Sequence, residues 1–215
     1  MKKGILFDLD GVLVNSEVED QRLNVDFMNL HGYKSDPKIF WLWIGSNPKL
    51  DTTSVIKKMM DPADGDPDKF MAALKEYRVP RRGMWNFADC MFPDTPVALK
   101  MLKERGLKIA CCSSSKLSYI EKALRECGIT EYFDLVISGR DLEFSKPDPD
   151  IYLKAMKHFG LTPEECLVIE DSPIGIEAGL NAGMTVLARH DHTFGLDQSK
   201  ADYLIEDLTE IVNYL

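Results

Sequence analysis

The chain begins with MKKGILFDLDGVLV, residues 1–14, and this stretch decides its fold. The apolar part, Gly4 to Phe7, is typical of a short buried strand. The strand ends at two aspartates, Asp8 and Asp10, with Gly11 directly after them. Residues i and i+2 of an extended chain point to the same side. We therefore expect the two carboxylates to lie close together at the strand's carboxyl end, where open α/β sheets bind ligands.

Two carboxylates this close resist ionising together, and a cation would relieve their repulsion. Mg²⁺ is the natural candidate because it prefers carboxylate oxygens. An Asp-x-Asp-Gly sequence is also common in surface turns, which aspartate and glycine both suit. Residues 1–14 by themselves fit a metal site and a surface turn equally well.

The composition is ordinary for a globular protein, with 215 residues of which 45% are hydrophobic and 28% charged. A formal net charge of −9 argues against a general nucleic-acid binder, which needs a basic face. It also means that local positive charge must bind any anionic substrate. Asp8 interrupts the first apolar run after four residues, and no segment approaches transmembrane length. We expect a cytoplasmic protein with no membrane partner.

The cysteines are odd in number and lack C-x-x-C spacing. Three of them fall in apolar, strand-like runs, which favours buried thiols in a reducing compartment over disulfides. The five are Cys90, Cys111, Cys112, Cys127 and Cys166.

A helical block follows the first strand directly. No convincing strand pattern lies between Tyr33 and Phe87, whereas residues 47–60 and 66–78 have helical spacing. Prolines and glycines separate these segments. Residues 16–88 are therefore predicted to be an all-helical insertion, with 1–15 and 89–215 forming the rest of the fold.

The rest of the chain alternates between apolar runs and helical patterns, which predicts a doubly wound α/β fold with a parallel sheet covered on both faces. The expected strands are 107–112, 133–137, 166–169, 184–188 and 203–205. The expected helices are 96–105, 117–127, 149–159, one from about residue 172, and a terminal helix at 208–215.

Polar residues gather directly after the expected strands, whose carboxyl ends share one edge of a parallel sheet. Each has a plainer interpretation by itself, as a helix cap or a solvated surface lysine. Their joint occurrence favours phosphoryl transfer, which needs a carboxylate nucleophile, Mg²⁺, a lysine and a hydroxyl. These residues are Asp8, Asp10, Ser113, Ser114, Lys146, Glu170 and Asp171.

In its polar motifs the chain resembles the haloacid dehalogenase-like hydrolase superfamily. The matching motifs are DLDGVLV at 8–14, Ser113, KPDP at 146–149, and IEDS at 169–172 with Gly175. They occur in the right order and cover nearly the whole chain. Residues 16–88 resemble the helical cap domain of the β-phosphoglucomutase and phosphoglycolate-phosphatase branch. The resemblance implies a Rossmann-like core, residues 1–15 and 89–215, with this inserted cap.

The resemblance also implies a two-step mechanism. Asp8 would attack phosphorus and form an aspartyl phosphate. Asp10 would protonate the leaving oxygen and then activate water. Lys146 would neutralise the nucleophile and the phosphate. The dehalogenase branch lacks the second aspartate, so Asp10 argues against carbon–halogen cleavage.

The remaining implied roles concern binding. Ser113 and the backbone N–H groups of Leu9 and Ser114 would contact the phosphate. Mg²⁺ would be held by the carboxylates of Asp8 and Asp171 and the backbone carbonyl of Asp10, with Glu170 beside it.

The implied function is a magnesium-dependent phosphatase of a small phosphorylated metabolite, such as a sugar or organic-acid phosphate, acting as a monomer or weak dimer. A β-phosphoglucomutase-type mutase is the first alternative. A non-catalytic signalling domain with a phosphorylated aspartate is a remote one, because there the aspartate follows an internal strand.

The mutase alternative depends on the helical block. The mutase branch carries a histidine in its first cap helix and a lysine and an arginine flanking a glycine. If Gly45 is aligned with that glycine, Ile44 occupies the position of the lysine, and Pro48 or Lys49 occupies the position of the arginine. The position of the histidine is occupied by Asp20. A carboxylate there would repel a second phosphate, so we expect hydrolysis to dominate.

His190 and His192 invite a metal interpretation, but two histidines in a polar loop are more often solvated. The sequence favours the solvated loop.

Overall fold

The computed structural model describes residues 1–44 and 52–215, and the chain divides into two compact units. The α/β unit comprises Met1–Asn15 and Asn86–Leu215, and the helical unit comprises Ser16–Trp85. The sequence placed the second boundary between residues 88 and 89. That the two units act as core and cap domains stays a prediction.

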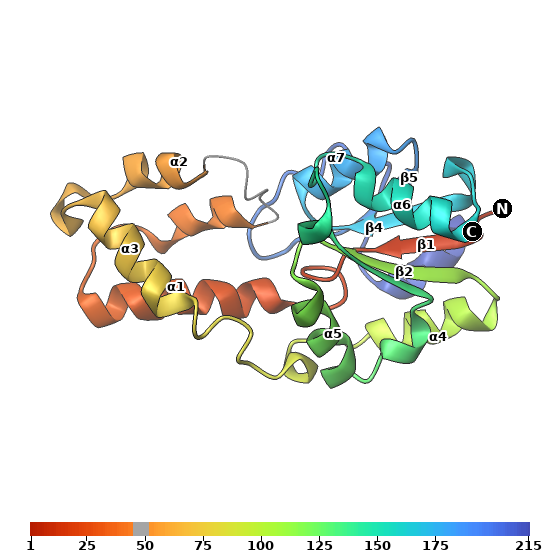
Figure 1. Ribbon diagram of the computed structural model, residues 1–215, viewed down its shortest axis with the longest axis horizontal. Coiled ribbons are helices and arrows are strands. Elements are labelled where there is room, and N and C mark those ends of the chain that lie inside the picture. Colours follow the sequence, from red (N-terminus) through yellow and green to blue (C-terminus); the bar gives the residue numbers. More distant parts are fainter. Residues whose placement is uncertain (45–51) are drawn as a thin grey trace. The chain divides into compact units, whose positions relative to one another are not determined.

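In the described residues, six strands form one parallel sheet in the order β3-β2-β1-β4-β5-β6 (Figure 1). Phe7, the last residue of β1, pairs with Cys111 of β2 and Ile169 of β4. The end of the first strand therefore lies between the ends of two others, and the doubly wound sheet is confirmed. The strands are β1 (Gly4–Phe7), β2 (Lys108–Ser113), β3 (Leu135–Ser138), β4 (Cys166–Glu170), β5 (Thr185–Arg189) and β6 (Tyr203–Ile205).

Helices cover both faces of this sheet, with α6 and α7 on one face and α4 and α5 on the other (Figure 1). They are α4 (Thr95–Glu104), α5 (Leu117–Glu126), α6 (Asp150–Phe159) and α7 (Pro173–Asn181). The expected terminal helix is a 3-10 helix, η7 (Leu208–Tyr214), which begins with a capping box of Asp207 and Glu210. Other 3-10 turns are η3 (Phe87–Asp89), η4 (Thr130–Tyr132), η5 (Gly139–Asp141) and η6 (Pro163–Glu165).

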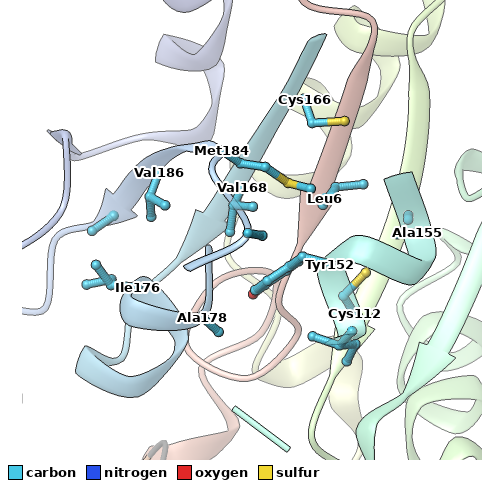
Figure 2. Close-up of a cluster of buried hydrophobic side chains, with 14 residues drawn as sticks. Leu6, Cys112, Tyr152, Ala155, Cys166, Val168, Ile176, Ala178, Met184 and Val186 are labelled. Carbon is cyan, nitrogen blue, oxygen red and sulfur yellow. The ribbon is translucent and has the colours of Figure 1, made fainter. Parts of the chain in front are cut away.

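The core beneath α6 and α7 is built from alternate residues of the strands, because successive strand side chains point to opposite faces. Figure 2 shows Leu6, Val168 and Val186 of three strands packed with Tyr152 of α6. Cys112 and Cys166 belong to this core, and Cys111 is buried as well. Burial raises the pKa of Cys112 to about 12. The prediction of buried thiols is confirmed for all three.

The helical unit packs around its own aromatic cluster, in which the Phe27 and Phe70 rings meet edge to face at 5.5 Å. No strand occurs among its described residues, as predicted. Its elements are α1 (Ser16–His31), η1 (Pro37–Trp43), α2 (Thr52–Met59), η2 (Pro62–Asp64) and α3 (Pro67–Arg78). Residues 47–51 of the helix expected at 47–60 lie outside the described residues. Among the helices described in either unit, none is long and apolar enough to cross a bilayer.

Candidate active site

A buried lysine joins two carboxylates at the carboxyl edge of the sheet. Asp8 directly follows β1, and Glu170 is the last residue of β4. Lys146, from the segment before α6, donates through Nζ to Asp8 Oδ1 and to Glu170 Oε1, both at 2.6 Å. All three side chains are buried. The sequence predicted only that Lys146 lies at the start of a helix. In the structure its ammonium lies between the carboxylates of Asp8 and Glu170.

Both oxygens of Glu170 are bonded to several donors. Oε1 also accepts the Tyr152 hydroxyl at 2.8 Å, while Oε2 accepts the Asp171 and Ser172 amides and the Ser172 hydroxyl at 3.0 to 3.3 Å. A Cβ at Gly175 would overlap this carboxylate, so glycine there leaves room for it. These bonds favour a positioning role for Glu170, which holds the lysine and the turn into α7.

Burial and charge set the protonation of this cluster. Burial raises the pKa of the Asp8 carboxyl to about 7, against the opposing charge of Lys146. Burial alone would lower the pKa of Lys146, but the charges of Asp8 and Glu170 raise it well above its ordinary value. Burial would raise the pKa of Glu170, but the charge and hydrogen bond of Lys146 lower it. The lysine therefore stays an ammonium, and a second cation would favour ionised Asp8.

The acids of this cluster suit a hard divalent cation. Asp8, Glu170 and Asp171 each offer a carboxylate oxygen, and these oxygens lie within 4.8 Å of one another. Gly11 has φ +82°, and a Cβ there would overlap the Asp171 carboxylate, so glycine allows the first loop to approach it. With all three carboxylates ionised, one ammonium leaves excess negative charge in a buried site, which a divalent cation would balance. Oxygen donors are the ligands that Mg²⁺ prefers.

The chain turns sharply after Asp8. The carbonyl of Leu9 accepts the amides of Leu13 and Val14, at 2.9 and 3.1 Å, and Gly11 donates to Val14. β1 ends at Phe7, but the amide of Asp8 still donates to the Ile169 carbonyl of β4 at 2.9 Å, so Asp8 continues the line of the strand before the chain turns. That the carboxylates of Asp8 and Asp10 lie on one side stays a prediction.

Asp10 has its own hydrogen-bond donors. Its carboxylate accepts the Ser115 hydroxyl at 3.0 Å and the Tyr119 hydroxyl at 3.2 Å, while Asp8 bonds Lys146. Asp8 thus accepts an ammonium and Asp10 two hydroxyls, and the charge of Asp10 contributes to the raised pKa of Asp8. These different donors give the two carboxylates different environments, which suits two different chemical roles.

Ser113 closes β2 and lies in register with Ser138 of β3. Its hydroxyl is buried and accepts the amide of Ser115 at 3.1 Å. The turn that contains Ser114 therefore runs along the same sheet edge and reaches Asp10 through Ser115. Leu9, in the turn after β1, has a fully buried side chain.

Three residues at this edge were missed by sequence reasoning. Tyr152 lies in the helix expected at 149–159 but was not named as a site residue, and its hydroxyl donates to Glu170. Ser115 and Tyr119 bond Asp10. The sequence offered one signal for all three residues. Each has a hydroxyl side chain on or near a helix that begins at the carboxyl edge of the sheet, where ligands bind.

The structure corrects one argument about Asp20. Within the helical unit its carboxylate pairs with Arg78 Nη2 at 2.7 Å and Arg82 Nε at 3.4 Å. Two guanidinium groups compensate the negative charge, so Asp20 does not stand as a lone carboxylate that repels a phosphate. Ile44 is buried, and Gly45, Pro48 and Lys49 lie outside the described residues.

Comparisons with known proteins assign the chain to a family. Residues 2–183 match the model of the haloacid dehalogenase-like hydrolase family. The chain is 29% identical to a phosphoglycolate phosphatase of Nitrosococcus oceani, covering 98% of this chain and 95% of that protein. It is 32% identical to the chloroplastic protein SUPPRESSOR OF QUENCHING 1 of Arabidopsis thaliana, over 86% of this chain and 17% of that protein's length.

Among solved structures, a predicted phosphoglycolate phosphatase from Haemophilus somnus 129pt has the same fold, with a TM-score of 0.79. The match covers 99% of this chain and 97% of that chain at 22% identity.

Proposed function

This chain belongs to the haloacid dehalogenase-like hydrolase family, and on that premise we propose that it is a magnesium-dependent phosphatase of a small phosphorylated metabolite. The observation that carries the proposal is the buried Lys146, bonded to Asp8 and Glu170 beside Asp171. Relatives named as phosphatases match nearly the full chain, which supports hydrolysis of a phosphate ester.

Asp8 is the proposed nucleophile. One carboxylate oxygen attacks phosphorus, the bond from phosphorus to the ester oxygen breaks, and the phosphoryl group passes to Asp8. Lys146, held by Glu170, keeps its ammonium at the Asp8 carboxylate and neutralises negative charge that gathers on the phosphoryl oxygens. Ser113 and the amides of Leu9 and Ser114 are proposed to bind those oxygens.

Asp10 is the proposed proton carrier. Its carboxyl gives a proton to the leaving oxygen, and the resulting carboxylate takes a proton from the water that cleaves the acyl phosphate. The hydroxyls of Ser115 and Tyr119 orient this carboxylate. Separate donors for Asp8 and Asp10 allow one acid to act as nucleophile while the other moves protons.

Asp8 and Asp171, with the backbone carbonyl of Asp10, would hold Mg²⁺, and Glu170 would stand next to it. The ion would supply positive charge that lowers repulsion between the nucleophile and an anionic phosphate.

The helical unit, Ser16–Trp85, is proposed to be the cap domain and to close over bound substrate to exclude water. Small-angle scattering tests this proposal. The radius of gyration should fall when Mg²⁺ and a tight-binding phosphate analogue are added, and an unchanged radius with proven binding would contradict it.

Hydrolysis is proposed to dominate over phosphoryl transfer between two positions of one sugar. Asp20 stands where the mutase branch has a histidine, and its carboxylate is already paired with Arg78. Phosphorus NMR with β-glucose 1-phosphate and a trace of the bisphosphate distinguishes the two. Inorganic phosphate is expected, whereas glucose 6-phosphate without inorganic phosphate would identify a mutase.

The direct test of phosphatase activity is a panel of sugar and organic-acid phosphates, assayed for released phosphate with Mg²⁺ and with EDTA. Turnover of at least one ester with Mg²⁺, and its loss with EDTA, is expected. Equal turnover in both conditions would reject magnesium dependence, and no turnover on any ester would reject the proposed class.

A further inference from the structure

A second group of potential metal ligands lies at the last pair of strands. Arg189 of β5 pairs with Ile205 of β6, and the amide of His190 donates to the Ile205 carbonyl at 2.9 Å. His190 and Glu206 are therefore the next residues along two paired strands. The pairing of the two strands therefore places the backbones of His190 and Glu206 side by side.

One carboxylate joins two imidazoles here. His190 Nδ1 lies 2.7 Å from Glu206 Oε1, and His192 Nε2 lies 2.6 Å from Glu206 Oε2. The two rings are 4.2 Å apart between centroids. One donor atom of each residue falls within 4.8 Å of the other two. Hydrogen bonds from the two histidines lower the pKa of Glu206, so its carboxylate is ionised at neutral pH.

The loop that carries His192 is held by internal bonds. The Asp191 carboxylate accepts the amides of Thr193, Phe194 and Leu196, at 2.8 to 3.1 Å. At the loop's end, Gln198 Nε2 donates to the carbonyls of Arg189 and Asp171, both at 2.7 Å.

This cluster differs chemically from the catalytic acids. It is exposed and supplies two nitrogen donors with one carboxylate, whereas the catalytic group is buried and supplies only oxygens. Imidazole suits zinc and similar transition ions, and Mg²⁺ prefers oxygen ligands. Three protein ligands also leave a fourth tetrahedral position for water.

We propose that His190, His192 and Glu206 form a second metal site that binds Zn²⁺. The ion takes the place of the hydrogens between the imidazoles and the carboxylate, and each ring binds it through an unprotonated nitrogen, so a neutral imidazole carries its hydrogen on its other nitrogen. The bound ion joins the end of β6 to the loop after β5 and stabilises the folded chain by mass action.

The test uses the full chain without an affinity tag, in excess Mg²⁺ so that the catalytic carboxylates are occupied. Zn²⁺ is titrated while long-range proton–nitrogen NMR spectra follow the ring nitrogens of the four histidines. His190 and His192 should shift with Zn²⁺, and His31 and His158 should not. The thermal unfolding midpoint should rise with added Zn²⁺.

The single variants His192→Ala and Glu206→Gln should weaken Zn²⁺ binding by about tenfold or more, because loss of even an outer partner of a metal costs that much. All three residues are exposed, so these variants should keep the fold, which near-UV circular dichroism checks. His158→Ala is the matched control and should bind as the parent does. Unchanged affinity in the two variants, ring shifts at other histidines only, or no binding at millimolar Zn²⁺ would each overturn the proposal.

Discussion

The buried polar groups of the two units differ in how completely they are bonded. In the α/β unit, Glu170 uses both oxygens, and Asp94 uses both of its own toward the Arg189 guanidinium at 2.9 and 3.0 Å. In the helical unit, several buried polar atoms lack a hydrogen bond within the described residues. They include Asp20 Oδ1, Asn24 Oδ1 and Arg78 Nε.

This difference shows where a rigid site can be built. An unmade hydrogen bond on a buried polar atom costs about 1–3 kcal/mol, so the α/β unit avoids a cost that the helical unit bears. A fully bonded network also fixes the orientation of its members, which electrostatic catalysis requires. We therefore expect substitutions in the α/β network to have larger effects than those in the helical unit.

The largest effect is expected for Asp8→Asn. An amide cannot serve as the nucleophile, so the turnover number should fall by on the order of 10⁴–10⁶, as for the loss of other covalent nucleophiles. Phosphate release under saturating substrate measures it. Asp26→Asn, an exposed aspartate of α1, is the control. Activity near that of the parent would reject Asp8 as nucleophile.

Asp10→Ala should have the next largest effect. Loss of general acid–base catalysis costs about 10²–10⁴ in rate. Tyr119→Phe removes one hydrogen bond to the same carboxylate and should cost only about five- to tenfold, the value of one such bond. Rate–pH profiles of both variants separate the two roles. A larger loss in Tyr119→Phe than in Asp10→Ala would contradict the assignment.

Asp94→Asn tests the α/β network through stability. Burial would raise the pKa of Asp94, but hydrogen bonds from Arg189 and from the Leu208 amide lower it. The pair should contribute about 2–4 kcal/mol to the free energy of unfolding at pH 7. A lowered folded-state pKa means that this contribution is present above about pH 4, the ordinary aspartate value, and is lost as pH falls through the folded pKa.

Urea unfolding of the parent and of Asp94→Asn, from pH 7 down to pH 3, measures that contribution. The difference between them should shrink below about pH 4, where the unfolded parent chain takes up a proton on Asp94 while the folded chain keeps this carboxylate ionised. Glu177→Gln, which removes an exposed pair with Lys200, should cost less than about 1 kcal/mol. A difference that stays constant between about pH 5 and pH 3 would show that the charge of Asp94 is not the cause.

Asp20→Asn should have the smallest effect. Its carboxylate pairs with Arg78 and with the half-exposed Arg82, and one of its oxygens makes no hydrogen bond. We expect a smaller loss in the free energy of unfolding than for Asp94→Asn, measured by the same urea method, because Asp20 accepts one hydrogen bond from Arg78 whereas Asp94 accepts two from Arg189 and one from the Leu208 amide. A loss larger than that of Asp94→Asn would reverse the comparison between the two units.

The fold could be predicted because local patterns and global topology agree in the α/β unit. The strand at Gly4–Phe7 and the last strand, Tyr203–Ile205, were predicted with the bounds that the structure has. In the helical unit, η1 was missed, because its start depends on the Asp36 cap before Pro37 and not on an apolar period.

The side-chain partners in the site could not be predicted as well. Sequence reasoning placed Lys146 at the right edge, but its contact with both Asp8 and Glu170 depends on how the segment before α6 crosses that edge. The different hydrogen-bond donors of Asp8 and Asp10 depend on the tight turn after Asp8, which the rule for extended chains does not describe. Tyr152 was hidden because a buried tyrosine follows the same pattern as an apolar residue.

The central claim is that Asp8 accepts a phosphoryl group. The most direct measurement mixes the enzyme with Mg²⁺ and a substrate found in the ester panel, quenches with acid within one turnover, and maps the digested chain by mass spectrometry. The account predicts one added phosphoryl group on the N-terminal peptide, located at Asp8 and absent from Asp8→Asn. A phosphoryl group at any other residue, or steady phosphate release with no acyl phosphate on the chain, would contradict it.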